Sequence, residues 1–314
     1  MAPDPVAFGL DVGGTNVRAG LVAEDGTIVD RDQIATPRGA DARVAALVAI
    51  VTALRDRHGV AGLPVGVGAA GLVDLDGVVR YAPNLDWRDA PVRAQLAAAL
   101  GVEVRVENDA AAAAWGEYRV GAAQHAGGGA LMLTIGTGVG GGLIMDDRLI
   151  RGSTGVGAEF GHMIVHEGGA RCPCGNSGCL EAVASGTAIG RLAREALAAD
   201  DVASSLRELD DVSGTAVTAA AHAGDDLATR VLAEAGCWLG VGIAALVNSL
   251  DPEVVVIGGG ALSAGALLLD PAITAYHARV VAAAHRVVPP VLRAQLGDDA
   301  GLVGAALLIW EQRS

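Results

Sequence analysis

The sequence predicts an α/β fold built from two similar halves around a cleft. Short apolar strands alternate with helical stretches along most of the 314 residues, and this alternation is typical of α/β architectures. Residues 10–22 (LDVGGTNVRAGLV) also resemble residues 133–145 (LTIGTGVGGGLIM), because each reads as a strand, a Gly/Thr turn and a returning strand. No linker rich in Pro or Ser separates the halves, so we expect them to pack against a common cleft.

The order of elements follows from hydrophobic periodicity and from the Gly-rich turns. In the first half we expect strands at residues 6–12, 17–23, 27–36, 64–70 and 102–107, and helices at 41–58, 90–100 and 109–118. In the second half we expect strands at 130–135, 140–145 and 253–257, helices at 186–197 and 225–250, and a turn at 258–260.

Composition excludes several kinds of chemistry. The chain has 52% hydrophobic residues, which suffices for a large core, and a formal net charge of −14, which argues against a nucleic-acid partner. It contains no lysine, since all 22 Lys+Arg residues are arginines. A Walker A loop, a protein-kinase lysine and Schiff-base catalysis are therefore excluded. The N-terminal residues lack an export signal and the apolar runs are short or broken, so we expect a cytoplasmic protein without a membrane span.

Two glycine turns are candidate phosphate sites. Asp11-Val12-Gly13-Gly14-Thr15 and Gly136-Thr137-Gly138 would expose backbone N–H groups and a threonine hydroxyl, and Gly258–Gly260 adds a third glycine run. Such turns are often only tight turns, but related copies in both halves favour phosphate binding. Without lysine, the phosphate charge would be neutralised by amides, threonines and a divalent metal, and Asp11 is a candidate to orient Mg²⁺ through water.

Asn108 and Asp109 lie where a strand passes into a helix. Either side chain could cap that helix. An aspartate at such a strand end can also accept a hydroxyl proton as the hydroxyl attacks phosphorus. Capping and catalysis are compatible, so both interpretations stand at this point.

Three of the four cysteines lie in one segment, residues 158–181 (AEFGHMIVHEGGARCPCGNSGCLE). The Cys-x-Cys-x4-Cys spacing of Cys172, Cys174 and Cys179 would let three thiolates and one imidazole hold a tetrahedral zinc ion. Both His162 and His166 are within reach as the fourth ligand. A disulfide with a spare thiol is the alternative. Cys237 stands apart in an apolar stretch and is expected to be buried.

Eight motifs spread over nearly the whole chain resemble those of one family. They are DVGGTNVRAG from Asp11, APNLDW from Ala82, ENDAAAAAWGE from Glu107, TIGTGVGGG from Thr134, AEFGH from Ala158, CPCGNSGCLE from Cys172, DPEVVVIGGG from Asp251 and AGLVGAA from Ala300. Together they identify the chain as similar to the ROK family of sugar kinases, above all its bacterial ATP-dependent glucokinases, within the actin-like superfamily.

This resemblance implies a two-lobed actin-like (ribonuclease H-like) fold with a central cleft. The small α/β lobe would comprise residues 1–109 and about 299–314, and the large lobe residues 110–298. The implied activity is phosphorylation of glucose by ATP with Mg²⁺, with Asp109 as general base on the 6-hydroxyl. A dimer or tetramer is also implied.

The resemblance further assigns roles to individual residues. The implied hexose ligands are Asn84, Asn108, Asp109, Glu159, His162 and Glu181. The implied nucleotide ligands are Asp11, Gly13, Gly14, Thr15, Asn16, Thr137, Gly138, Gly259 and Gly260. The implied zinc ligands are His162, Cys172, Cys174 and Cys179, which favours His162 over His166.

Two departures from the family pattern concern single positions. Asn16 stands where many members have lysine, so a direct charge contact at that position would be lost, and Ala158 replaces a glycine. Kinases for another hexose or an N-acetylhexosamine, a polyphosphate donor, or a sugar-sensing regulator without turnover are the alternatives. The regulators carry a helix-turn-helix before the first glycine turn, and the roughly ten residues before Gly13 are too few for one.

Overall fold

The computed structural model describes residues 4–199 and 202–311 of the chain. By internal contacts the chain forms two compact units. Unit 1 comprises Met1–Met132, Gly142–Ala158 and Ala294–Ser314, and unit 2 comprises Leu133–Gly141 and Glu159–Arg293. These units are groups of residues in mutual contact and are not the same as the lobes expected from the sequence. The lobe boundaries therefore stay a prediction.

Unit 1 is built on a five-stranded sheet with the strand order β3-β2-β1-β4-β8. These strands are β1 (Pro5–Val12), β2 (Asn16–Ala23), β3 (Ile28–Ala35), β4 (Val65–Ala69) and β8 (Val104–Asn108). The neighbouring strands β1, β4 and β8 run parallel to one another, so their carboxyl ends meet at one edge of the sheet. This edge is where open α/β sheets usually place ligands.

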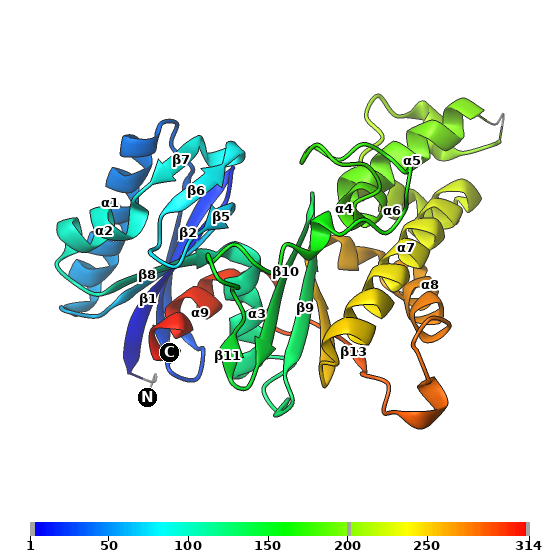
Figure 1. The fold of residues 1–314 in the computed structure, drawn as a ribbon. Coiled ribbons are helices and arrows are strands. Elements are labelled where there is room, and N and C mark those ends of the chain that lie inside the picture. Colours follow the sequence, from blue (N-terminus) through cyan, green and yellow to red (C-terminus); the bar gives the residue numbers. More distant parts are fainter. Residues whose placement is uncertain (1–3, 200–201, 312–314) are drawn as a thin grey trace. The chain divides into compact units, whose positions relative to one another are not determined.

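Helices lie against this sheet (Figure 1), and they pack on it through apolar faces and through glycines. They are α1 (Ala40–His58), α2 (Val92–Leu100), α3 (Asp109–Val120) and α9 (Ala300–Leu307). A Cβ on Gly66 of β4 would lie 1.7 Å from the Ala305 carbonyl oxygen, and one on Gly304 would lie 1.8 Å from the Ala112 carbonyl oxygen. Glycine at these positions therefore lets α9 lie directly on the sheet and on α3.

A small three-stranded sheet with the order β5-β6-β7 completes the ordered core of unit 1. Its strands are β5 (Leu72–Val73), β6 (Val79–Ala82) and β7 (Trp87–Ala90), and the 3₁₀ helix η1 (Pro83–Leu85) joins the last two. The sequence prediction did not include these strands, because two to four residues are too few to show a period.

A second five-stranded sheet has the order β11-β10-β9-β12-β13, and the boundary between the units falls within β9 and β10. Its strands are β9 (Ala130–Ile135), β10 (Val139–Met145), β11 (Arg148–Leu149), β12 (Val254–Gly258) and β13 (Val291–Arg293). The helices of unit 2 are α4 (Leu180–Ala184), α5 (Gly186–Ala199), α6 (Gly214–His222), α7 (Asp226–Leu250) and α8 (Ala266–His277).

The long helix α7 is the centre of unit 2. Its side chains Leu232, Ala235 and Leu239 are fully buried, and Gly236 lets α8 approach so closely that a Cβ would lie 2.3 Å from the Leu268 carbonyl oxygen. By length and composition alone α7 could span a membrane, but 61% of its most apolar window is buried in the protein, as in the core helix of a globular fold. Cys237, expected to be buried, is exposed, because it projects from the opposite side of this helix.

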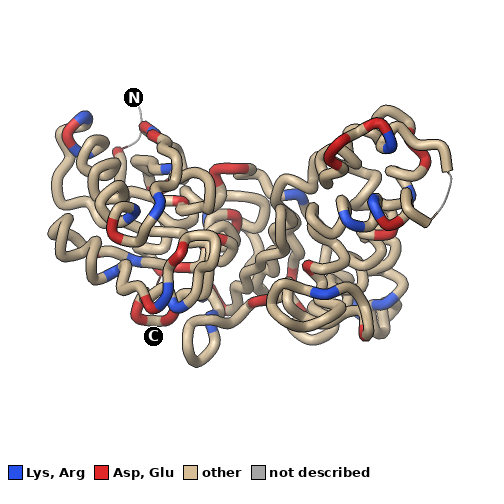
Figure 2. The backbone as a smooth tube through the Cα atoms, turned by 90° about the horizontal axis from the view of Figure 1, so that it is seen from above, with Lys and Arg blue, Asp and Glu red and all other residues tan. Residues whose placement is uncertain are grey.

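The excess negative charge is distributed over the described chain. Figure 2 shows Asp and Glu residues on loops and helix ends of both units, with arginines interspersed among them. In unit 1 many of these charges are paired, as in Arg57 with Asp30 (2.7 Å) and Arg80 with Asp74 (2.7 Å). The side chains of Arg57 and Arg80 are about half exposed, so such pairs contribute little to stability.

Candidate active site

The carboxyl end of the unit 1 sheet brings together Asp11 on β1 and Asp109 at the start of α3. Val12 of β1 pairs with Ala69 of β4, and Ala69 pairs with Asn108 of β8, so the three strands end in register. Burial, and after it the nearby Asp109 carboxylate, raise the pKa of Asp11 to about 6. The two carboxylates therefore share one electrostatic environment.

Asp109 is held at the helix start by its own backbone surroundings. Its Oδ1 accepts a hydrogen bond from the Ala110 N–H at 2.9 Å. Burial raises the pKa of Asp109 above its usual range, against hydrogen bonds that lower it. A carboxylate with a raised pKa is a better proton acceptor for an alcohol, which is the property that a general base needs.

Asn108 is the residue that caps α3. Its Oδ1 accepts from the Ala111 N–H at 3.0 Å, and its Nδ2 donates to the Gly71 carbonyl oxygen at 3.1 Å. These contacts fix the amide, and the second N–H of Nδ2 can still donate to a ligand. Of the two capping candidates in the sequence, Asn108 fills the cap and leaves Asp109 in the first turn.

The first glycine turn is tightened by its own backbone. The Gly13 N–H donates to the Asn16 carbonyl oxygen (3.0 Å), and the Thr36 hydroxyl donates to the Gly13 carbonyl oxygen (2.6 Å). Gly14 and Thr15 are exposed at the tip. A Cβ on Gly14 would lie 3.3 Å from the Asn84 Cβ, so this turn and Asn84 are neighbours.

Asn84 lies exposed on η1, and a buried arginine holds the segment around it. Arg43 of α1 is 3% exposed and donates to the Leu85 and Pro37 carbonyl oxygens. Its guanidinium lies 5.1 Å from the centre of the Trp87 ring. Sequence reasoning missed this support, because an arginine within a helix is normally exposed.

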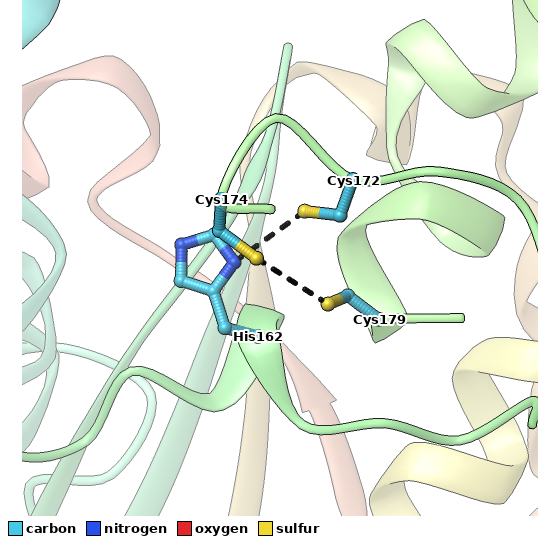
Figure 3. Close-up of side chains that lie close together, drawn as sticks. All are labelled: His162, Cys172, Cys174 and Cys179. Atoms are coloured by element: carbon cyan, nitrogen blue, oxygen red, sulfur yellow. Dashed lines mark hydrogen bonds between the residues drawn. The ribbon is translucent and has the colours of Figure 1, made fainter. Parts of the chain in front are cut away.

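In unit 2 the four candidate metal ligands converge. Figure 3 shows the side chains of His162, Cys172, Cys174 and Cys179 pointing toward one another, and their ligand atoms all lie within 4.8 Å of one another. Cys172 Sγ is 3.7 Å from His162 Nδ1, and Cys174 Sγ is 3.7 Å from Cys179 Sγ. Ligands of a tetrahedral zinc ion stand about 3.8 Å apart, whereas disulfide sulfurs stand about 2 Å apart. The geometry therefore fits a zinc site and not a disulfide.

Glycines fold the cysteine loop into this shape. Gly175 (φ 104°) and Gly178 (φ 74°) have left-handed backbone conformations, and a Cβ on Gly178 would lie 1.7 Å from the His166 carbonyl oxygen. The His166 ring stacks on Trp238 of α7 with centroids 4.4 Å apart. His166 thus anchors the loop to α7, and His162 is the histidine in the cluster.

His162 and Glu181 connect the cluster to other candidate ligands of unit 2. His162 Nδ1 faces Cys172, and its Nε2 lies 3.9 Å from a Glu159 carboxylate oxygen. Glu181, in the first turn of α4, accepts from the Val139 N–H at 3.0 Å, while the Cys172 thiol donates to its other oxygen at 3.8 Å. Glu181 therefore joins the cysteine cluster to the second glycine turn.

The second glycine turn opens into a cavity of about 530 Å³ within unit 2. Thr137 and Gly260, both predicted nucleotide ligands, line it together with Arg194, Ser213 and Thr215. The N-terminus of α5 is fixed on this turn, since the Gly186 N–H donates to the Gly136 carbonyl oxygen (2.8 Å) and the Thr187 hydroxyl to that of Thr137 (2.8 Å). The sequence prediction missed the residues from α5 and α6, because no local motif marks them.

These features define an α/β protein that combines two glycine turns with an aspartate at a strand end and a Cys₃His cluster. The sequence profile of the ROK family matches residues 7–312, and the chain belongs to this family. The predicted α/β, actin-like fold and the family assignment are thereby confirmed.

Individual relatives agree with this assignment. The glucokinase of Streptomyces coelicolor is 40% identical over 98% of this chain and 98% of its own. The structure of a ROK family glucokinase from Streptomyces griseus in complex with glucose and AMPPNP has a TM-score of 0.84 at 42% identity, covering 96% of this chain and 98% of that one. The ROK hexokinase of Thermus thermophilus has a TM-score of 0.83 at 38% identity, covering 96% of both chains.

Proposed function

We propose that this protein phosphorylates glucose at the 6-hydroxyl with ATP as donor. The observation that carries the proposal is the placement of Asp109 at the carboxyl end of β8, next to Asp11 and with a raised pKa. The glucokinase names of relatives at 40% identity, and the glucose and AMPPNP bound to the Streptomyces griseus enzyme, support both substrates.

In the proposed reaction, Asp109 accepts the proton of the sugar 6-hydroxyl as that oxygen attacks the γ-phosphorus of ATP. The O–P bond to the sugar forms, the bond to the β-phosphate oxygen breaks, and ADP leaves. Because Asp109 Oδ1 accepts the Ala110 N–H, we assign proton transfer to Oδ2.

We assign sugar binding to a set of side chains with both donors and acceptors. They are Asn84, Asn108, Asp109, Glu159, His162 and Glu181. The Asn108 amide is oriented by its cap and by Gly71, and the Nε2 side of His162 faces Glu159. Fixed donors and carboxylates suit a ligand whose hydroxyls each donate and accept.

The nucleotide would use the glycine turns and the unit 2 cavity. We assign phosphate binding to Gly13, Gly14, Thr15, Asn16, Thr137 and Gly138, and the adenosine side to Gly259 and Gly260. The N-terminus of α5 beside the second turn adds a favourable dipole for phosphate. Mg²⁺ would arrive with ATP, and Asp11 is placed at the strand end to contact its water shell.

The Cys₃His cluster fits zinc in donor type and spacing. His162, Cys172, Cys174 and Cys179 would hold the ion, which would supply structural cross-linking of the loop. His162 would then have its Nδ1 fixed by the cluster, leaving Nε2 to face the sugar. Burial raises the pKa of Cys172 to about 12, so metal binding would displace a thiol proton at neutral pH.

We further propose that the enzyme acts in the cytoplasm, as a homodimer or homotetramer, without nucleic-acid or membrane partners. The net charge of −14 disfavours a phosphate backbone. The buried apolar window of α7 fits a core helix.

The test is ADP release from ATP and Mg²⁺ over a panel of glucose, mannose, fructose, N-acetylglucosamine and N-acetylmannosamine, with a sugar-free blank. We expect turnover with glucose and none with 6-deoxyglucose, which lacks the acceptor hydroxyl. Turnover on another sugar alone would reassign the substrate. In a parallel assay of sugar phosphate formation, turnover with polyphosphate and not with ATP would reassign the donor. Sugar binding without turnover would instead support a sensor.

A further inference from the structure

A buried ion cluster lies behind the proposed catalytic aspartate in unit 1. Arg151 donates through Nε to Glu107 and through both terminal nitrogens to Glu311, with Nη1 at 2.6 Å from Glu311 Oε1. The side chains are 10%, 3% and 1% exposed, respectively. One guanidinium thus bridges two buried carboxylates that are far apart in sequence.

Glu107 connects this cluster to the site. It is the second-last residue of β8, and its Oε1 accepts a hydrogen bond from the Asn108 N–H at 3.1 Å, while Oε2 is the atom that pairs with Arg151. Asp109 directly follows Asn108 in the chain. The carboxylate that Arg151 binds therefore contacts the backbone immediately before Asp109.

Glu311 connects the cluster to the end of the described chain. Its Oε1 also accepts from the Leu149 N–H at 3.1 Å, and its carbonyl oxygen accepts from Arg105 of β8 at 2.8 Å. Arg105 donates to the Leu308 carbonyl oxygen as well (2.8 Å). Two arginines, Arg105 and Arg151, therefore fix the segment after α9 to β8.

Arg151 also begins the loop that leads to Glu159. Its carbonyl oxygen accepts from the Gly157 N–H at 2.8 Å, and a Cβ on Gly157 would lie 2.7 Å from that oxygen. This closes residues 151–157 into a compact loop that ends two residues before Glu159. One residue thus contacts both the strand end before Asp109 and the loop before a proposed sugar ligand.

We infer that Arg151 is a positioning residue for phosphoryl transfer, acting through Glu107 on the Asn108–Asp109 junction and through its loop on Glu159, with Glu311 as its fixed partner. Burying two carboxylates with one guanidinium is a costly way to stabilise a fold, since apolar residues of similar volume often do as well. The cluster makes sense where fixed geometry is needed, because small displacements of a base can lower a rate by about a hundredfold. The inference rests on the proposed base role of Asp109.

Three variants test it: Arg151→Met, Glu311→Gln and the control Arg148→Met, which removes an exposed arginine of β11 outside the cluster. Glu311→Gln keeps the shape of its side chain, so it serves if Arg151→Met does not fold. Amide hydrogen exchange is followed in peptides covering residues 107–112 and 150–158. We expect amide exchange in both peptides to be faster in Arg151→Met and Glu311→Gln than in the parent. In Arg148→Met we expect it to be unchanged.

Kinetics provide the second readout. We expect kcat to fall by about tenfold for Glu311→Gln and about a hundredfold for Arg151→Met, with KM for ATP within about twofold of the parent. A structural defect alone would lower the fraction of active enzyme and leave the pH at which kcat/KM falls unchanged, whereas displacement of Asp109 would shift it.

The outcomes separate the inference from the proposed function. Unchanged exchange at residues 107–112 in folded Arg151→Met and Glu311→Gln would overturn the inference, whatever the substrate. Local exchange that rises while kcat stays at the parent value would overturn it as well. If the parent enzyme turns over no sugar, the proposed function fails, and the exchange data still decide whether Arg151 holds the strand end.

Discussion

The two units hold their candidate functional groups in different ways. In unit 1, Asp11, Asn108 and Asp109 lie at the ends of parallel strands, and backbone amides and a buried ion cluster fix their surroundings. In unit 2, Glu159 precedes the short 3₁₀ helix η2 (Phe160–His162) and His162 ends it, and their side chains are more than a third exposed. His162 is also a member of the Cys₃His cluster.

This difference indicates a division of tasks. Burial raises the pKa values of Asp11 and Asp109, the groups proposed to handle a proton and hydrated Mg²⁺. Groups that only need to point at a ligand can lie on a loop, provided that something fixes the loop. Perturbing the strand ends should therefore affect the chemical step, and perturbing the cluster should affect sugar binding.

The largest effect is expected for Asp109→Asn. The amide has nearly the same shape but cannot accept the hydroxyl proton, so kcat should fall by about a thousandfold or more while KM for glucose stays within a few-fold. Steady-state kinetics with Asp76→Asn, an 82% exposed aspartate, as control check this. A variant with the parent kcat would show that Asp109 is not the base.

The next largest effect is expected in unit 2, for Cys174→Ser. Loss of one ligand should release zinc and raise KM for glucose by about 10–100-fold, with a smaller effect on kcat. Metal analysis and glucose titration, with Cys237→Ser as control because Cys237 lies outside the cluster, check this. Zinc-free parent enzyme with normal glucose binding would contradict the assignment.

A further effect concerns the pH dependence of unit 1. Because the pKa of Asp11 is raised from 3.8 to about 6, ionising it destabilises the fold as pH rises from about 4 to 6. Asp11→Asn should therefore raise the free energy of unfolding by about 1–3 kcal/mol above pH 6, and by nothing below pH 4. Activity should fall instead, since the variant loses its proposed contact with hydrated Mg²⁺.

Denaturant unfolding at pH 4 and pH 8 measures the difference between Asp11→Asn and the parent. Asp76→Asn, which changes an 82% exposed carboxyl, is the control. An equal effect of Asp11→Asn at both pH values would mean that Asp11 ionises normally in the folded protein.

The smallest effect is expected for Gly138→Ala in unit 2. The added Cβ would lie 2.3 Å from Glu181 Oε2, a flexible carboxylate, so the side chain should move and weaken its bond to the Val139 N–H. We expect KM for glucose and for ATP to rise together by a few-fold. Gly127→Ala, where a Cβ meets no atom within 4 Å, is the control. A change in one KM only would contradict the role of Glu181 as a link between the two ligands.

Much of the fold could be predicted from the sequence. The strands β1, β2, β9 and β10 and the helices α1 and α7 lie within a few residues of the predicted ranges, because each has a clear period bounded by glycine, proline or a cap. The short strands β5–β7 and the helices α4, α6, α8 and α9 were missed. Their sequences are too short or too uniformly apolar for a period to identify them.

The candidate site divides in the same manner. Sequence motifs brought out Asp109, the glycine turns and the cysteine cluster, since each is local and has a chemical reason for its spacing. The supports for these groups were not predictable. Arg43 contacts Leu85, 42 positions away in the chain, and Arg151 contacts Glu107, 44 positions away. Glu311 contacts Arg151, 160 positions away.

The sequence by itself determined the family, the aspartate proposed as base, the glycine turns and the residue types proposed as metal ligands, because these are properties of local order and composition. Only the tertiary structure decided that Asn108 caps α3, that His166 stacks on Trp238 while His162 joins the cysteines, and that Arg151 lies buried between two carboxylates. Each of these depends on which distant segments meet, and on the burial that results. Burial and long-range contacts have no local signature in a sequence.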